Sequence, residues 1–157
     1  MDKIKKVLFV CTGNSCRSIM AEGLMKDALK GLGKEGIKVS SAGVSAIDGF
    51  RPMRETIEAM KREGVDVSGF RSRALTDEMI EDSDLILVMT SRHMDDIIKR
   101  MPQAAPKTHM LKQYGHSGDS CACEDLDIPD PIGKTMEEYE YTLDEIKKEV
   151  NRIARIL

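Results

Sequence analysis

Continuous hydrophobic blocks alternate along this chain with blocks in which hydrophobic residues recur every three or four positions. Apolar runs at 5–10 and 84–89 predict buried strands of a parallel sheet. An alternating pattern at 37–41 predicts another strand, and a further one is expected near 108–112. The remaining pattern predicts helices at 17–32, 53–64, 76–81, 91–101 and 135–156.

Strands that alternate with helices indicate an α/β fold with a parallel sheet. The chain has 157 residues, enough for one hydrophobic core, and no repeat or linker divides it. We therefore expect a single domain over 1–157, with its ligand at the carboxyl ends of the strands. Ser91 is expected to cap the helix that follows it. The segment 113–134 has no regular pattern, and so long a loop in a compact domain is commonly functional.

The overall charge and hydropathy limit the range of partners. A formal net charge of −3 argues against a general nucleic-acid partner. No run approaches the length of a membrane span, and no N-terminal apolar region resembles a signal peptide. We expect a cytoplasmic protein without a membrane partner, whose four cysteines are reduced.

The segment between the first strand and the first helix carries the clearest chemistry. Cys11 follows the strand, and Arg17 opens the helix after a loop of small polar residues. Backbone N–H groups and the helix dipole would face an anion there, and Arg17 could grip two of its oxygens. Cys11 would lie beneath as a thiolate nucleophile. Since a buried structural turn has no use for Arg17, we predict a phosphate-binding loop, in which Gly13 and Asn14 tolerate positive φ.

The long irregular segment offers a partner for this nucleophile. It contains Asp125, Asp127 and the pair Asp130-Pro131. A phosphatase needs a general acid to protonate the leaving group, and Pro131 would hold Asp130 in an extended conformation. The residues alone leave two interpretations open, a general acid and a solvated acidic loop.

Taken together, these motifs resemble the low-molecular-weight protein tyrosine phosphatases. That family also includes bacterial protein-arginine phosphatases and thioredoxin-coupled arsenate reductases. The resemblance implies a four-stranded parallel sheet flanked by helices, a phosphorylated protein as substrate, and a monomer or weak dimer. It implies no metal or other cofactor, because Arg17 and backbone amides compensate the charge. It rests on the segments 10–18, 20–22, 41–43, 84–89 and 130–131.

The resemblance also implies roles for individual residues. Cys11 would form a cysteinyl-phosphate, Arg17 would bind the phosphoryl oxygens, and Asp130 would act first as acid and then as base. Ser41 would help Asn14 to hold the loop in shape, and Ser18 would donate a hydrogen bond to the Cys11 thiolate. The substrate-binding residues would be Thr12, Gly13, Asn14, Ser15, Cys16 and Ser18.

Three departures from the family pattern occur; the first counts against tyrosine specificity, and the other two change the support around the loop. Ile132-Gly133 stands where animal members have aromatic residues, Phe70 replaces a common His, and Ile19 replaces a common Pro. Ser15 resembles the Thr of arginine phosphatases more than the bulky apolar residue of many tyrosine phosphatases. Phosphotyrosine is the expected substrate, and phosphoarginine is the alternative. Phe50 is interpreted either as an apolar wall for the substrate or as a packed loop residue.

The remaining cysteines and histidines leave further alternatives. Cys16 is interpreted either as a disulfide partner of an oxidised Cys11 or as a small buried residue. Cys121 and Cys123 could join a relay, bind a soft metal or be plain exposed thiols. Arsenate reduction is the weakest alternative, because the segment 90–93 lacks the relay cysteines of those relatives. The three histidines are interpreted as surface or packing residues: His93, His109 and His116.

Overall fold

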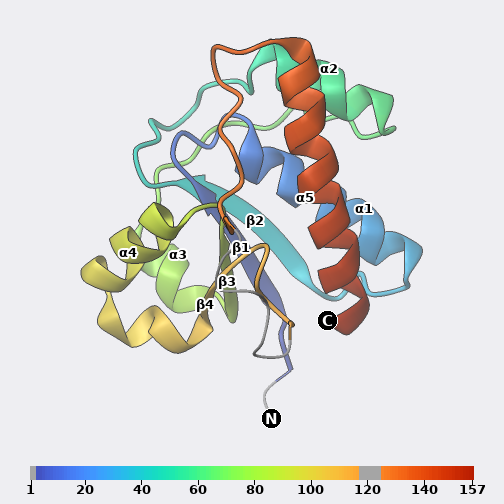
Figure 1. Cartoon of the computed structure of the whole chain (residues 1–157). Helices are drawn as coiled ribbons and strands as arrows, with labels where there is room; N and C mark the ends of the chain where they lie inside the picture. The colour runs from blue at the N-terminus through green and yellow to red at the C-terminus, as the bar shows by residue number, and fades with distance from the viewer. Residues whose placement is uncertain (1–2, 117–124) are drawn as a thin grey trace.

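A four-stranded parallel sheet forms the centre of the protein, as the sequence predicts (Figure 1). The computed structural model describes residues 3–116 and 125–157. The strand order is β2-β1-β3-β4, so β2 and β4 are the edge strands. The strands are β1 (Lys6–Cys11), β2 (Lys38–Gly43), β3 (Leu85–Val88) and β4 (Thr108–Met110).

Helices cover both faces of the sheet, as Figure 1 shows. Successive residues of a strand point to opposite faces. Phe9 and Leu87 therefore pack into one hydrophobic cluster with α1, α2 and α5, whereas Leu8 and Ile86 pack into a second cluster with α3 and α4. The helices are α1 (Arg17–Gly31), α2 (Arg54–Arg62), α3 (Asp77–Asp82), α4 (Ser91–Arg100), the 3₁₀ helix η1 (Pro102–Lys107) and α5 (Met136–Ile156).

Two local predictions differ from the structure, one through a local contact and one through a long-range contact. The cap of α4 is Thr90 and not Ser91, because the Thr90 hydroxyl accepts a hydrogen bond from the His93 N–H at 3.3 Å. Strand β2 continues to Gly43, beyond its predicted end. There the Gly43 N–H donates to the Arg73 carbonyl at 2.9 Å, and Gly43 forms a parallel bridge with Ala74.

The carboxyl ends of the central strands carry the segments of chemical interest. Strand β1 ends at Cys11, and α1 begins at Arg17 on the same edge of the sheet. The chain returns to this edge after β4, where the Ile128 N–H donates to the Met89 carbonyl at 2.8 Å. Asp130 follows two residues later. Within the described ranges, no helix is long and apolar enough to cross a membrane.

Candidate active site

The conformation of the loop after β1 is set by Asn14. Its φ of 51° lies in the left-handed region, which asparagine tolerates better than most residues. The buried side chain fixes this turn through three hydrogen bonds. Its Nδ2 donates to the Ser18 Oγ at 2.7 Å and to the Ser41 Oγ at 3.0 Å, and its Oδ1 accepts from the Arg73 N–H at 2.9 Å. Asn14 therefore joins the loop to both α1 and β2.

Cys11 lies at the base of this loop, and its side chain is buried. Its Sγ is 2.9 Å from the Ser18 Oγ. Because that hydroxyl oxygen already accepts from Asn14, its hydrogen is free to donate to the sulfur. The Ser18 hydroxyl therefore holds the sulfur in a fixed position at the base of the loop.

Arg17 contributes a buried guanidinium group to the same loop. Its Nη1 donates to the Ile128 carbonyl at 3.0 Å, and its Nη2 lies 3.5 Å from the Thr12 Oγ1. The Nε has no hydrogen-bond partner among the described residues. A buried N–H without a partner costs free energy, so a bound oxyanion that accepts from it would be stabilised.

Asp130 lies beside Arg17, with its Oδ2 3.5 Å from the Arg17 Nη2. Its side chain is 42% exposed, so its carboxyl group can reach both solvent and a ligand in the loop. The other two candidate acids have structural roles instead. Asp127 accepts from the Ser91 N–H at 2.9 Å, and Asp125 accepts from the Asp127 N–H at 2.9 Å. Of the three carboxylates, it is therefore Asp130 that pairs with Arg17.

A family model described as "Low molecular weight phosphotyrosine protein phosphatase" matches residues 6–157. The chain belongs to this family. It is 38% identical to a protein-arginine-phosphatase of Geobacillus stearothermophilus, over 97% of this chain and 95% of that protein. It is 35% identical to an arsenate reductase of Staphylococcus aureus, over 97% of both. A crystal structure of a low molecular weight protein tyrosine phosphatase from T. tengcongensis superposes with a TM-score of 0.87 at 36% identity, covering 98% of this chain and 99% of that one.

His93 belongs to the site of this family member, although the sequence predicted a surface or packing residue. The buried ring lies with its Nε2 2.8 Å from the Thr12 Oγ1. Its Nδ1 accepts from the Thr90 N–H at 3.2 Å, so Nε2 carries the proton and donates to Thr12. The hydrogen of the Thr12 hydroxyl then remains free to donate to a ligand. No local pattern could have linked two residues 81 positions apart.

We expect His93 to make the fold sensitive to mild acid. Burial, and then the nearby Arg17, lower the pKa of His93 from 6.5 to about 4. Between these two pKa values the unfolded chain binds a proton at His93 and the folded chain does not. The free energy of unfolding therefore falls as the pH drops from 6.5 to about 4. His93→Gln should flatten this part of the profile, measured by urea unfolding at several pH values. His116→Gln, at an exposed position, is the control; equal slopes in both variants would contradict the expectation.

Glu22 ends a chain of buried hydrogen bonds that starts at Cys11. Ser41 accepts from Asn14 and donates from its Oγ to the Glu22 Oε1 at 2.6 Å. The other carboxylate oxygen of Glu22 pairs with the Lys26 Nζ at 2.5 Å. The sequence indicated Ser41 as a supporting residue but assigned no role to Glu22, because a glutamate on a helix is ordinarily a surface residue.

Cys16 is a buried free thiol at the N-terminus of α1. Burial, followed by the charges of Cys11 and Asp130, raises its pKa to about 12. A resolving thiol has to ionise before it attacks an oxidised sulfur, so this environment favours the interpretation of Cys16 as a packing residue. Cys121 and Cys123 lie outside the described residues.

Proposed function

We propose that this chain removes phosphate from phosphorylated protein side chains through a cysteinyl-phosphate at Cys11, with phosphotyrosine as the substrate. The proposal rests on one observation above all. A buried Arg17, which shares a seven-residue loop with the nucleophile, lies 3.5 Å from the carboxylate of Asp130. Nucleophile, anion-binding group and acid are thus supplied within one site.

The reaction would proceed in two displacements. The Cys11 thiolate attacks phosphorus, the bond between phosphorus and the side-chain oxygen breaks, and Asp130 gives that oxygen its proton. In the second step Asp130 takes a proton from water, the water oxygen attacks phosphorus, and the sulfur–phosphorus bond breaks. Arg17 and the loop amides hold the equatorial oxygens throughout. Inorganic phosphate and the thiolate are the products.

The choice of phosphotyrosine is supported by apolar groups on loops beside the nucleophile. The loop 45–53 is attached to the phosphate-binding loop at both ends, where Ser45 donates to the Thr12 carbonyl at 2.9 Å and Met53 to the Ser15 carbonyl at 3.1 Å. Phe50 on this loop is 62% exposed, which argues against the packed-residue interpretation. Ile132, two residues after Asp130, is 44% exposed. Both exposed side chains offer apolar surface to an aromatic substrate.

Phosphoarginine is the second candidate, favoured by Ser15 and by the similarity to the Geobacillus stearothermophilus protein. Ser15→Ile should raise the ratio of kcat/KM for phosphotyrosine over phosphoarginine, because it replaces a small hydroxyl with an apolar wall. An aromatic contact is worth about 0.5–1.5 kcal/mol, so the expected change is about 2–13-fold. Turnover of matched phosphotyrosine and phosphoarginine peptides measures both the ratio and the wild-type preference. An unchanged or lowered ratio would show that position 15 does not determine the preference between the two substrates.

A mechanism that needs a Cys11 thiolate requires a reducing compartment, so we propose a cytoplasmic location and a monomer or weak dimer. Arsenate reduction stays the weakest candidate, since the segment after β3 has no relay cysteine at 90–93. Thioredoxin-dependent turnover of arsenate, measured beside the phosphopeptides, separates this activity from phosphate hydrolysis. Turnover of arsenate without turnover of either phosphopeptide would overturn the proposed function.

A further inference from the structure

One buried carboxylate takes no part in the proposed reaction, although its hydrogen bonds lead to the loop that carries Cys11. Glu22 is 9% exposed and lies on α1. Burial of a carboxylate is costly unless hydrogen-bond donors and a cation compensate its charge. Glu22 has one of each, because the Ser41 Oγ donates to its Oε1 at 2.6 Å and the Lys26 Nζ pairs with its Oε2 at 2.5 Å. The carboxylate thus joins the buried network to a cation at the surface.

The hydrogens of this network run outward from Asn14 to two acceptors. The Asn14 Nδ2 gives one hydrogen to the Ser18 Oγ and the other to the Ser41 Oγ. Ser18 then has its own hydrogen free for the Cys11 sulfur at 2.9 Å. Ser41 directs its hydrogen to Glu22, and an ionised carboxylate can only accept hydrogen bonds. The carboxylate therefore fixes the direction of the Ser41 hydroxyl and, through it, one of the two bonds that hold the Asn14 amide.

Lys26 compensates the charge of this carboxylate and is itself held in place. Within residues 3–116 and 125–157, it is the one cation in ion-pair contact with Glu22. The two residues are four positions apart on α1, so they lie on the same face of the helix. The Lys26 Nζ also lies 5.1 Å from the centroid of the Phe70 ring, within the range of a cation–π attraction. Phe70 packs against the hydrophobic core, so the ammonium group has two fixed contacts.

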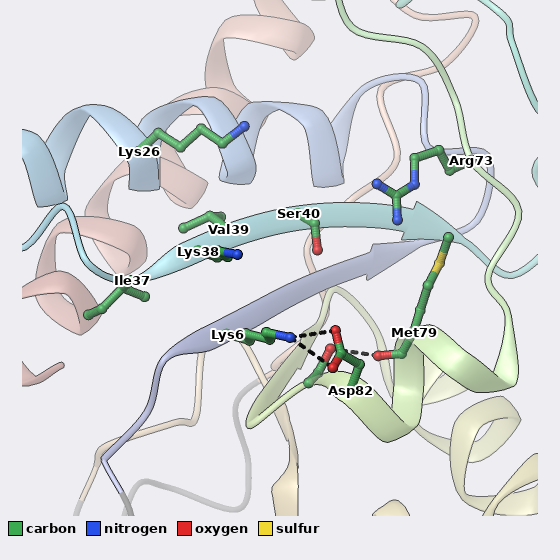
Figure 2. Close-up of a pocket in the computed structure, with 10 residues that line it drawn as sticks. Lys6, Lys26, Ile37, Lys38, Val39, Ser40, Arg73, Met79 and Asp82 are labelled. Atoms are coloured by element: carbon green, nitrogen blue, oxygen red, sulfur yellow. Dashed lines mark hydrogen bonds and ion pairs between the residues drawn. The ribbon is translucent and has the colours of Figure 1, made fainter.

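Lys26 reaches Glu22 from the solvent side of the network. Figure 2 shows its side chain lying along α1, beside a cavity of about 500 Å³ that Lys38 and Arg73 also line. The Lys26 side chain is 50% exposed, whereas the Glu22 side chain is 12% exposed. A substitution at position 26 can therefore remove the charge without opening a cavity in the core, and Met keeps an unbranched side chain there.

We propose that Lys26 is a positioning residue for the reaction at Cys11. Its ammonium group holds the Glu22 carboxylate in place, and Glu22 in turn orients Ser41 and Asn14. The inference rests on the proposed function, because it names a residue that keeps the loop of that site in its reactive geometry. Lys26 acts through this network and does not touch the substrate.

Loss of the Lys26 charge has a defined consequence for the network. Glu22 would be left as an uncompensated buried charge, which is strongly unfavourable. Its side chain would turn toward solvent and leave the Ser41 hydroxyl without its acceptor. The Asn14 amide would still donate to Ser18, so the loop would loosen without collapsing.

The rate of the chemical step tests the proposal. Lys26→Met should slow the p-nitrophenol burst from p-nitrophenyl phosphate about tenfold, short of the roughly 10²-fold that a misplacement of about 1 Å can cost. KM should change less than about twofold, because Arg17 and the loop amides still bind the phosphoryl group. Lys26→Arg retains the charge and should recover most of the lost rate. Lys30→Met removes a charge one turn further along α1, from an exposed residue without an ion pair in the described ranges, and should alter neither value.

Two comparisons separate positioning from a contribution to stability alone. In a Ser41→Ala background, Lys26→Met should have less than about a twofold effect on the burst, because the pathway already lacks its hydroxyl. The side-chain amide signals of Asn14 should move in the NMR spectrum of Lys26→Met and stay in place in that of Lys30→Met. A lower melting temperature with an unchanged burst rate, equal effects in both backgrounds, or unmoved Asn14 signals would overturn the proposal. A wild-type protein inactive on every phosphorylated substrate would count against the proposed function alone, and the Asn14 signals would then decide the role of Lys26.

Discussion

A Cys11→Ser variant is expected to lose turnover of p-nitrophenyl phosphate to below a few per cent of wild type while keeping its fold. The serine hydroxyl would need a base, and the group that contacts the Cys11 Sγ is the hydroxyl of Ser18, which acts as a donor. The substitution changes little volume at a buried position, so the melting temperature should change little. Steady-state rates and thermal unfolding measure the two parts of this expectation.

Phosphate binding provides the control for this variant. Arg17 and the loop amides are unchanged in Cys11→Ser, so inorganic phosphate should still raise its melting temperature. A variant that binds phosphate and does not turn over has lost the nucleophile alone. Retention of more than a few per cent of activity would exclude the covalent mechanism.

Asp130→Ala should slow phosphoenzyme formation by about 10²–10⁴-fold, the usual contribution of a general acid. The loss should be largest for substrates with poor leaving groups, because these most need a proton. Rapid-quench measurements on a series of aryl phosphates of different leaving-group basicity give the dependence. The position of the Asp130 carboxylate, 3.5 Å from the Arg17 guanidinium, is the structural reason for expecting the effect here.

Asp127→Ala is the matched control for the acid. Asp127 accepts from the Ser91 N–H at the start of α4, so its loss should lower stability by about 0.5–2 kcal/mol, as for other helix caps. It should leave the dependence on leaving group unchanged. The assignment is wrong if Asp127→Ala proves far more damaging to catalysis and Asp130→Ala is tolerated.

The arrangement of the loop after β1 could be predicted because its parts are neighbours in the sequence. Cys11 and Arg17 follow from a strand, a loop and a helix start within a few residues. The Asp-Pro pair indicated Asp130 from the sequence, and the family resemblance gave it a role. His93 could not be found in this way, since its contact with Thr12 depends on β1 and β3 lying side by side.

The end of β2 was missed for a related reason. Gly43 pairs with Cys11 of β1 and also with the segment at Arg73–Leu75, and pairing partners this far apart leave no periodic signal. The predicted cap of α4 was wrong by one residue, because both Thr90 and Ser91 have a hydroxyl that can accept a hydrogen bond from the first turn of the helix. The choice between them was made by the ring of His93, which Thr90 contacts through both its N–H and its hydroxyl.

Ile128 has a consequence for how the product leaves. Its N–H is bound to the end of β3 at Met89, and its carbonyl is bound to the Arg17 guanidinium. The backbone that carries Asp130 is therefore tied to the guanidinium group that we propose to bind phosphate. If this segment opened to release phosphate, the hydrogen bond from Arg17 to the Ile128 carbonyl would lengthen at the same time. Release of the product and loss of the Arg17 contacts to it would then occur as a single motion.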